Sequence, residues 1–238
     1  MGKNDVTNKY SSLNYRAARE HDKEAWRGHI LDVAGRLLTQ EGAAALTMRR
    51  LAQDVGCSTT VLYTMFVNKE GVISGLYEEG FSRLCTAFEA VPPHDHPLDH
   101  LEALGWAYRA NALANPTYYG VMFERVVPGF TPPDASVQRS YCAFTILREG
   151  VQACVDAGLT MMGSVEQVAN VLWTSVHGQV SLELAGYFPD PGEAHHCFAL
   201  LLQAVGVGLI PSIPPPSRQK IAHLLSAVDG EEKARTDT

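Results

Sequence analysis

The chain has 238 residues, of which 46% are hydrophobic and 19% charged, a composition typical of a soluble protein with one small domain and a larger domain that forms its own core. The N-terminus is polar, and the longest apolar run, residues 197–210, is interrupted and too short to cross a bilayer, so we expect neither a signal peptide nor a membrane-spanning segment. The net charge is −7, but residues 1–90 carry 11 of the 19 basic and 11 of the 26 acidic side chains, so the acidity of the remainder does not exclude a DNA-binding surface in the first part.

The N-terminal 22 residues differ in pattern from the rest of the chain. Residues 1–22 show no apolar periodicity and carry the basic side chains Lys3, Lys9, Arg16 and Arg19. We expect a flexible arm, which is either a plain disordered tail or a segment that runs along the DNA backbone or minor groove. A helical period then begins, with an apolar stripe long enough to bury two short helices. The stripe consists of Trp26, Ile30, Val33, Ala34, Leu37 and Leu38.

Residues 46–70 encode two short helices joined by a tight turn. Thr47 stands at the cap position of the first helix, and Gly56 can adopt the left-handed backbone that ends it. Ser58 can cap the second helix. Two short helices joined by a three-residue turn are the layout of a DNA reader that enters the major groove. The predicted apolar face of the second helix is Val61, Leu62, Met65 and Phe66.

The second short helix is predicted to direct its polar side chains outward, where they can hydrogen-bond to base edges or touch a thymine methyl. Lys69 begins the next periodic segment, where its charge and free backbone amides can bind a phosphate. Arg49 is favoured for a further contact, whereas Arg50 is left open between a contact and a solvated charge. The alternative is an ordinary small helical domain in which Tyr63 covers the core edge. The predicted DNA-binding residues are Thr47, Arg49, Ser58, Thr59, Thr60, Tyr63, Thr64 and Lys69.

The order of these segments resembles the N-terminal domain of the TetR family of bacterial transcriptional repressors, across residues 23–83. The matching segments are ILDVAGRLLTQEG, TMRRLAQDVG, VLYTMF and NKEGVISGLYEEG. The resemblance implies a helix-turn-helix DNA-binding domain, assigned to residues 23–70. The sequence departs from the family at Met65, where many members carry a His near the phosphate backbone, and in lacking Arg, Lys, Asn and Gln on the recognition helix. Base reading then depends on Thr hydroxyls and methyls, Tyr63 and DNA shape.

Residues 71–210 are predicted to form a helical effector-binding and dimerisation domain. A long helix runs from residue 71 to the prolines at 92 and 93, and no strand pattern competes with the amphipathic segments beyond it. These segments lie at about 98–114, 117–127, 135–157, 165–187 and 192–209. A bundle of this kind can hold a cavity. The residues predicted to line an effector site, each of which can equally be core packing, are Trp106, Tyr119, Phe123, Phe144, Trp173 and His177.

The segment LWTSVHGQVSLELAGYF, residues 172–188, resembles the Trp-His-Gly C-terminal domain of one branch of the same family. The resemblance implies that this helix and the next form a four-helix contact with their symmetry mates. A homodimer is therefore expected, and small residues such as Gly178 and Gly206 are compatible with close helix packing. His177 shares a helix face with Trp173 and is either an effector contact or a core histidine.

No cofactor or metal is predicted. His94, His96 and His100 would suit a metal if the fold brought three ligands together, but on a proline-bounded loop they are expected to be polar linker. The five cysteines, at positions 57, 85, 142, 154 and 197, show neither C-x-x-C nor metal-ligand spacing, so reduced thiols in a cytoplasmic protein, without disulfides, are expected. Residues 211–238 are predicted to be a proline-rich tail with one short helix.

Taken together, these patterns predict an all-α DNA-binding transcriptional regulator that is not an enzyme. The expected partners are double-stranded DNA, a second copy of the chain, and a small, mainly apolar effector that releases the protein from a palindromic operator. Two alternatives stay open: a helical enzyme that uses His177 with Glu183 or the histidine-rich loop, and a helical adaptor that binds protein through its acidic surface. The adaptor would show no salt-dependent affinity for duplex DNA.

Overall fold

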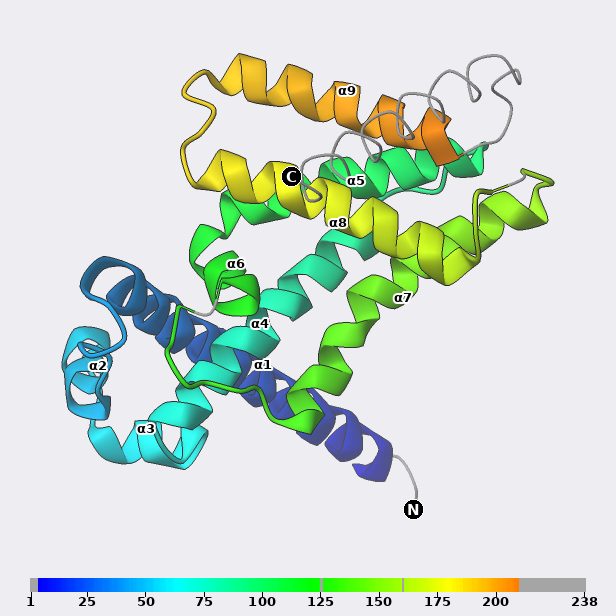
Figure 1. Ribbon diagram of the computed structural model, residues 1–238. Coiled ribbons are helices and arrows are strands. Elements are labelled where there is room, and N and C mark those ends of the chain that lie inside the picture. Colours follow the sequence, from blue (N-terminus) through cyan, green and yellow to red (C-terminus); the bar gives the residue numbers. More distant parts are fainter. Residues whose placement is uncertain (1–3, 125, 160, 210–238) are drawn as a thin grey trace, which may run out of the picture. The chain divides into compact units, whose positions relative to one another are not determined.

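The computed structural model of the protein describes residues 4–124, 126–159 and 161–209, and this part of the chain forms nine α-helices and no β-strand (Figure 1). The predicted all-α fold is thereby confirmed. The proline-rich tail and its predicted short helix lie outside the described residues. The chain divides into two compact units: Met1–Val91 with Ala107–Ile146, and Pro92–Trp106 with the residues from Leu147 onward.

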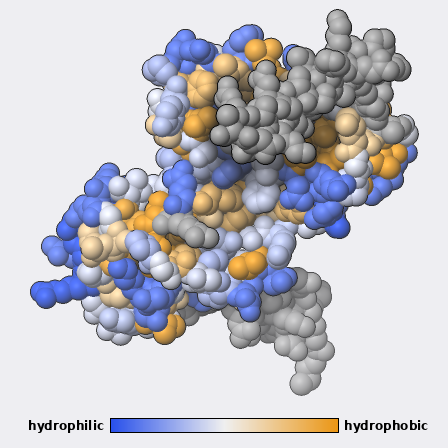
Figure 2. All heavy atoms as spheres, in the orientation of Figure 1, coloured by the Kyte–Doolittle hydropathy of each residue, from blue (hydrophilic) through white to orange (hydrophobic). Residues whose placement is uncertain are grey.

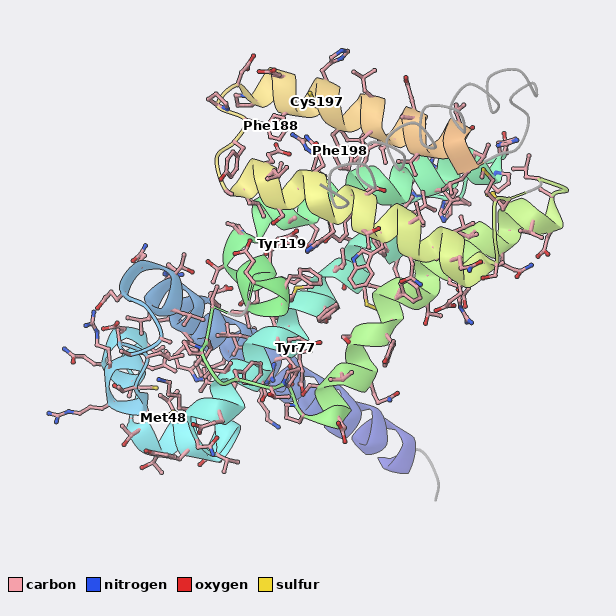
Figure 3. The ribbon with its side chains drawn as sticks, in the orientation of Figure 1. Met48, Tyr77, Tyr119, Phe188, Cys197 and Phe198 are labelled. Atoms are coloured by element: carbon pink, nitrogen blue, oxygen red, sulfur yellow. A yellow bond between two sulfur atoms is a disulfide. The ribbon has the colours of Figure 1, made fainter. Side chains whose placement is uncertain are left out.

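Unit 1 contains the two short helices predicted from the turn pattern. Its complete helices are α1 (Asn4–Glu41), α2 (Met48–Val55), α3 (Thr59–Phe66), α4 (Lys69–Glu89) and α6 (Pro116–Phe123). Helix α2 packs against α1, α3 packs against α2 and α4, and α6 packs against both α1 and α4. One apolar core, in which Leu31, Leu62 and Leu76 are completely buried, holds these elements together. Tyr77, at the edge of this core, is labelled in Figure 3.

The first helix is longer than its apolar stripe. Residues 1–22 are predicted to form a flexible arm, but α1 already begins at Asn4, so this prediction is corrected from that residue on. The physical reason is that each residue added to the end of an existing helix gains a hydrogen bond without a new nucleation step. A helix can therefore extend beyond the residues that bury its apolar face.

Unit 2 is formed by α8 (Val165–Leu184) and α9 (Pro191–Leu209), which pack against each other, and by parts of α5 (Pro97–Ala114) and α7 (Asp134–Asp156). Phe198 of α9, labelled in Figure 3, is completely buried, as is Val180 of α8. Gly105 of α5 allows a close approach to α9, because a Cβ atom at this position would come within 2.7 Å of the Leu202 side chain. The residue ranges of α5 and α7 are divided between the two units.

Cys85 of α4 and Cys142 of α7 form a disulfide within unit 1. The prediction of five reduced thiols is therefore wrong for this pair. The fold brings two cysteines that are 57 residues apart in the sequence to a Cα–Cα distance of 6.2 Å, which a disulfide can span. Local spacing cannot reveal a pair that far apart. Cys57, Cys154 and Cys197 are free thiols.

The junction between α3 and α4 is tight. Val67 has φ 66° and ψ −50°, and the Asn68 amide donates to the Phe66 carbonyl oxygen at 2.7 Å, so Val67 is the central residue of a γ-turn of the rare, strained type. Two residues into α4, Gly71 lies so close to the same carbonyl that an added Cβ atom would overlap it. The end of the short helix and the start of the long helix are thus held together by backbone, with no room for a side chain.

We expect Gly71→Ala to lower the free energy of unfolding by about 1–3 kcal/mol, since the methyl group can be accommodated only by moving backbone. Gly28→Ala is the matched control, because a Cβ atom at this position in α1 meets nothing within 4 Å. That variant should gain up to about 1 kcal/mol from the better helix propensity of Ala. Urea unfolding monitored by circular dichroism measures both values, and equal stabilities of the two variants would contradict the tight junction.

Candidate nucleic-acid interface

Three residues whose roles follow from their chemistry delimit α2 and the turn that leads to α3. The Thr47 hydroxyl caps α2 by accepting a hydrogen bond from the Arg50 amide at 3.2 Å. Gly56 ends α2 with φ 77°, in the left-handed region that favours glycine. The Ser58 hydroxyl caps α3 by accepting from the Val61 amide at 3.4 Å. The predicted two helices, caps and turn are confirmed.

The rotation of α3 about its own axis is fixed by two buried side chains. Leu62 is completely buried and Phe66 is 4% exposed. The Arg27 guanidinium of α1 lies over the Phe66 ring, 5.5 Å from its centroid. Met48, labelled in Figure 3, is buried at the start of the neighbouring α2. Val61 is predicted to share the buried face but is 36% exposed, because a helix this short presents only one narrow stripe to the core.

The solvent-exposed surface of α3 carries the predicted reading residues. Thr59, Thr60, Tyr63 and Thr64 are all exposed, with 52% of Tyr63 accessible. The Thr64 hydroxyl donates to the Thr60 carbonyl oxygen at 2.9 Å. Its hydrogen is therefore committed to the helix, which leaves Thr64 an acceptor and a methyl group to present. The structure places these residues on one surface, and their contact with bases stays a prediction.

Two neighbouring arginines at the start of α2 differ in their partners. Arg50 bonds to Asp54 at 2.9 Å and to Glu41 at 3.0 Å, and these carboxylates, with the Asp54 hydrogen bond as the largest effect, raise the pKa of Arg50. Arg49 is exposed and makes no hydrogen bond or ion pair with any described residue. In Figure 2 the outer edge of the α2–α3 region, at the lower left, is mainly blue and pale. Of the two arginines of α2, Arg49 is thus the one without a partner among the described residues.

Lys69 has a structural contact that the sequence did not reveal. Its ammonium donates to the Ala43 carbonyl oxygen at 2.6 Å, which ties the loop between α1 and α2 to the start of α4. The Asn68 side chain accepts from the Gly71 amide at 2.8 Å and so caps the same helix. Lys69 keeps two N–H groups beyond the one used. The contact of Lys69 with a phosphate therefore stays a prediction, and the hydrogen bond to Ala43 gives this side chain a structural role as well.

The six predicted effector residues do not form one cluster within either unit. Tyr119, Phe123 and Phe144 belong to unit 1. The rings of Tyr119 and Phe123 lie 5.1 Å apart, and both line a cavity of about 10 Å³, which is room for one water molecule. Tyr119 and Phe123 act in this structure mainly as packing.

The other three effector candidates belong to unit 2. The Trp106 ring is tilted against His195, with centroids 4.6 Å apart, and against Phe198, with centroids 5.0 Å apart, and the rings of Trp173 and His177 lie 6.3 Å apart. Burial lowers the pKa of His177 below its ordinary value, so the ring stays neutral at neutral pH. Trp173 and His177 lie near each other on α8, in keeping with the shared helix face that their spacing predicts, whereas their binding of an effector stays a prediction.

A larger cavity, of about 220 Å³, lies within unit 2 and is lined by residues of α5, α8 and α9. None of the six predicted effector residues lines it. Its walls are mainly apolar, with Glu102 and Gln203 as polar members. Sequence reasoning missed this site because it looked for aromatic residues, whereas the lining consists mostly of aliphatic side chains. The lining residues are Leu98, Leu101, Glu102, Met161, Val168, Leu172, Leu202, Gln203, Gly206, Val207 and Leu209.

The histidine-rich loop brings no metal-ligand set together in the part of the chain that the structure describes, where no group of three His, Cys, Asp or Glu side chains could hold a metal ion. His94 and His100 approach each other with ring centroids 6.0 Å apart, and His96 accepts from the Leu98 amide at 3.3 Å. None of the helices within the described ranges combines the length and the apolar character needed to cross a membrane.

Comparisons with known proteins match both parts of the chain. The family described as bacterial regulatory proteins, tetR family, matches residues 30–76, and the tetracyclin repressor-like C-terminal domain matches residues 101–205. A curated HTH-type transcriptional regulator of Mycobacterium tuberculosis is 23% identical over 221 residues, which cover 79% of this chain and 94% of that protein. The Trp-His-Gly resemblance has no counterpart among these matches and stays a prediction.

Solved structures share the fold. A protein of unknown function from Rhodococcus sp. RHA1 has a TM-score of 0.67 at 24% identity, covering 78% of this chain and 95% of that chain. The TetR family transcriptional regulator PfmR from Thermus thermophilus has a TM-score of 0.59 at 20% identity, covering 73% and 97%. The matched regions include the capped α2–α3 turn and most of the helical remainder. The chain belongs to the TetR family of transcriptional regulators, which are DNA-binding proteins and not enzymes.

Proposed function

We propose that this regulator is a cytoplasmic repressor that binds a palindromic operator as a homodimer and is released by a small, mainly apolar effector. The observation that carries the proposal is the face of α3, where four exposed hydroxyl-bearing residues stand on a helix that is capped at its start and fixed by Leu62 and Phe66. Such a face suits hydrogen bonding to base edges in the major groove. Two such helices about 34 Å apart would read successive major grooves.

Exposed apolar side chains on α8 and α9 support the homodimer. The side chains concerned are Val171, Leu182, Leu200 and Val207, which are between 45% and 58% exposed. A Cβ atom at Gly178 of α8 or at Gly208 of α9 would meet nothing within 4 Å, so both helices offer open backbone for close packing. Burial of these groups against a second copy would be favourable, at about 25 cal/mol for each Å² removed from water.

The effector half of the proposal is supported by the aliphatic cavity of unit 2. Its volume of about 220 Å³ suits a molecule somewhat larger than benzene, which fills an engineered cavity of about 150 Å³ in another protein. Its lining contains no cationic side chain, so a carboxylate ligand would find no counter-charge there. Effector binding would favour an arrangement in which α4 moves and the two recognition helices no longer match the operator spacing, at a cost of typically 1–3 kcal/mol.

The DNA contact can be tested with the two neighbouring arginines. DNA fragments selected from genomic DNA by the full-length protein supply the operator. We expect Arg49→Ala to weaken binding and to reduce the slope of log K against log salt by about 1, as for the loss of one phosphate contact. Arg50→Ala should leave the slope unchanged, because that side chain is already neutralised by Glu41 and Asp54. Fluorescence anisotropy at several salt concentrations measures both.

A matched pair of substitutions on the recognition helix completes this test. Tyr63→Ala should lower operator affinity, whereas Val61→Ala, at an exposed position of the same helix whose side chain cannot form a hydrogen bond, should change it less. If the Arg49→Ala, Tyr63→Ala double variant bound the selected fragment as tightly as the unmodified protein, the proposed reading face would be wrong.

The effector cavity can be filled without a clash. Gly206 lines the cavity, and a Cβ atom there meets nothing within 4 Å, so Gly206→Leu should occupy the space that a ligand needs. Gly28→Leu is the control, because a Cβ atom at Gly28 also meets nothing within 4 Å and Gly28 belongs neither to the cavity lining nor to the proposed dimer helices. With benzene or indole as the probe, we expect a rise in melting temperature for the unmodified protein and for the control, and none for Gly206→Leu. An equal rise in all three proteins would rule out this cavity as the binding site.

A further inference from the structure

The first half of α7 is joined to α4 at two points within unit 1. Near its start, the Ser136 hydroxyl, in a residue only 2% exposed, donates to a Glu78 carboxylate oxygen at 2.7 Å. Further along, Cys142 forms the disulfide with Cys85. Glu78 and Cys85 are seven residues apart on α4, which is two helical turns, so both points lie on the same face of that helix. The hydrogen bond and the disulfide are therefore two point contacts on one face of α4.

This contact continues to the recognition helix. The second oxygen of Glu78 faces the Arg27 guanidinium of α1 at 3.8 Å. The same guanidinium lies over the ring of Phe66, the last residue of α3 and one of the two side chains that fix its rotation. Gly75 of α4 leaves room for this arrangement, since a Cβ atom there would come within 3.2 Å of Arg27 and 3.3 Å of Phe66. A direct line of contacts thus runs from α7 to the end of α3.

We propose that Cys85 and Cys142 form a thiol switch whose oxidised state holds α7 against α4 and thereby stabilises the DNA-reading position of α3. The oxidant is a small organic disulfide. The Cys142 thiolate attacks it and forms a mixed disulfide, releasing one small thiolate. The Cys85 thiolate then attacks the Cys142 sulfur and releases the second. Two cysteine thiols become one disulfide, the small disulfide becomes two thiols that take up the two protons, and the electrons balance.

The burial of the two cysteines sets the order of these steps. Cys85 is 8% exposed, whereas Cys142 is only half-buried, so a small disulfide reaches Cys142 first. The other cysteines are not part of the proposed switch. Burial raises the pKa of the Cys154 thiol to about 11, which leaves almost no thiolate at neutral pH. Cys57 lies beside the α3 cap Ser58, where its oxidation would disturb DNA binding directly, so it has to be removed in any test.

Whether oxidation raises or lowers DNA affinity depends on which motion the Cys85–Cys142 disulfide prevents. In the dithiol state, α7 can leave α4 at the cost of the Ser136 hydrogen bond, and Glu78 then loses a partner that helps to orient it toward Arg27. In the disulfide state this separation cannot occur. Oxidation therefore raises the fraction of molecules in which Phe66 and α3 have the described positions, and a larger competent fraction gives a lower apparent Kd.

The experiment uses the full-length protein with Cys57→Ser and Cys197→Ser, treated with oxidised glutathione or with dithiothreitol. Intact mass, lower by two hydrogen atoms, and peptide mapping report the Cys85–Cys142 bond. Anisotropy on the selected DNA fragment reports affinity, which we expect to be about threefold or more higher for the oxidised protein. Adding Cys142→Ser should remove the difference between the two treatments. Equal affinities of the oxidised and reduced proteins, or failure of the bond to form in the folded protein, would overturn the switch.

A second variant tests the line of contacts separately from the bond. Ser136→Ala keeps both cysteines and removes the hydrogen bond to Glu78, so it should still form the disulfide while its redox-dependent change in affinity shrinks. An undiminished change would overturn the route through Glu78. The DNA readout rests on the proposed reading face, so amide hydrogen exchange of residues 59–66 is measured in parallel. Slower amide exchange of these residues on oxidation supports the switch even if the protein binds no DNA fragment. In that case the proposed function is wrong and the switch is not. Unchanged exchange contradicts the switch itself.

Discussion

The burial of Leu62 and Phe66 beneath α3 determines which face of the recognition helix meets the solvent. A helix of eight residues is not stable alone in water, so α3 exists because the core of unit 1 holds it. Burial of two side chains of this size contributes about 1.5–3 kcal/mol each. They are four residues apart and therefore share one stripe, so any rotation that presented other residues to DNA would expose both. The outward position of Thr60 and Tyr63 is a consequence of apolar packing.

The rest of unit 1 adds directional bonds to this apolar base. On the side of α6, Arg83 of α4 bonds to Asp32 of α1 at 2.9 Å and to Asn115 at 2.8 Å, and the Tyr118 hydroxyl donates to the same Asp32 oxygen at 2.7 Å. Burial, together with the hydrogen bond to Asp32, raises the pKa of Tyr118, so its hydroxyl remains a donor. Packing against apolar surface permits small slides, whereas such bonds are either made or broken. The helices α1, α4 and α6 therefore move as a group or by breaking identifiable bonds.

Sequence reasoning succeeds where a structure depends on neighbours in the chain and fails where it depends on distant ones. Thr47, Gly56 and Ser58 were predictable because a cap or a left-handed turn is decided within about four residues. The pairing of Arg50, in contrast to Arg49, was not predictable, because one of its partners, Glu41, lies on the preceding helix. The same limit hid the Lys69 contact with Ala43, the cysteine pair and the aliphatic cavity, each of which joins segments far apart in the sequence. The helical fold itself was predictable because its periodicity is local.

The chemistry of the reading face limits how this protein can recognise DNA. With Arg50 already paired and no Arg, Lys, Asn or Gln on α3, the bidentate contacts that usually select guanine or adenine are absent from this helix. What it presents is hydroxyl acceptors, threonine methyls and a phenol, a set suited to thymine methyl groups and to the shape of the groove. Single contacts of this kind discriminate weakly, so high selectivity requires many of them. A second copy of the helix, held at a fixed distance, doubles the number of such contacts. Specific recognition by this face therefore requires the proposed dimer.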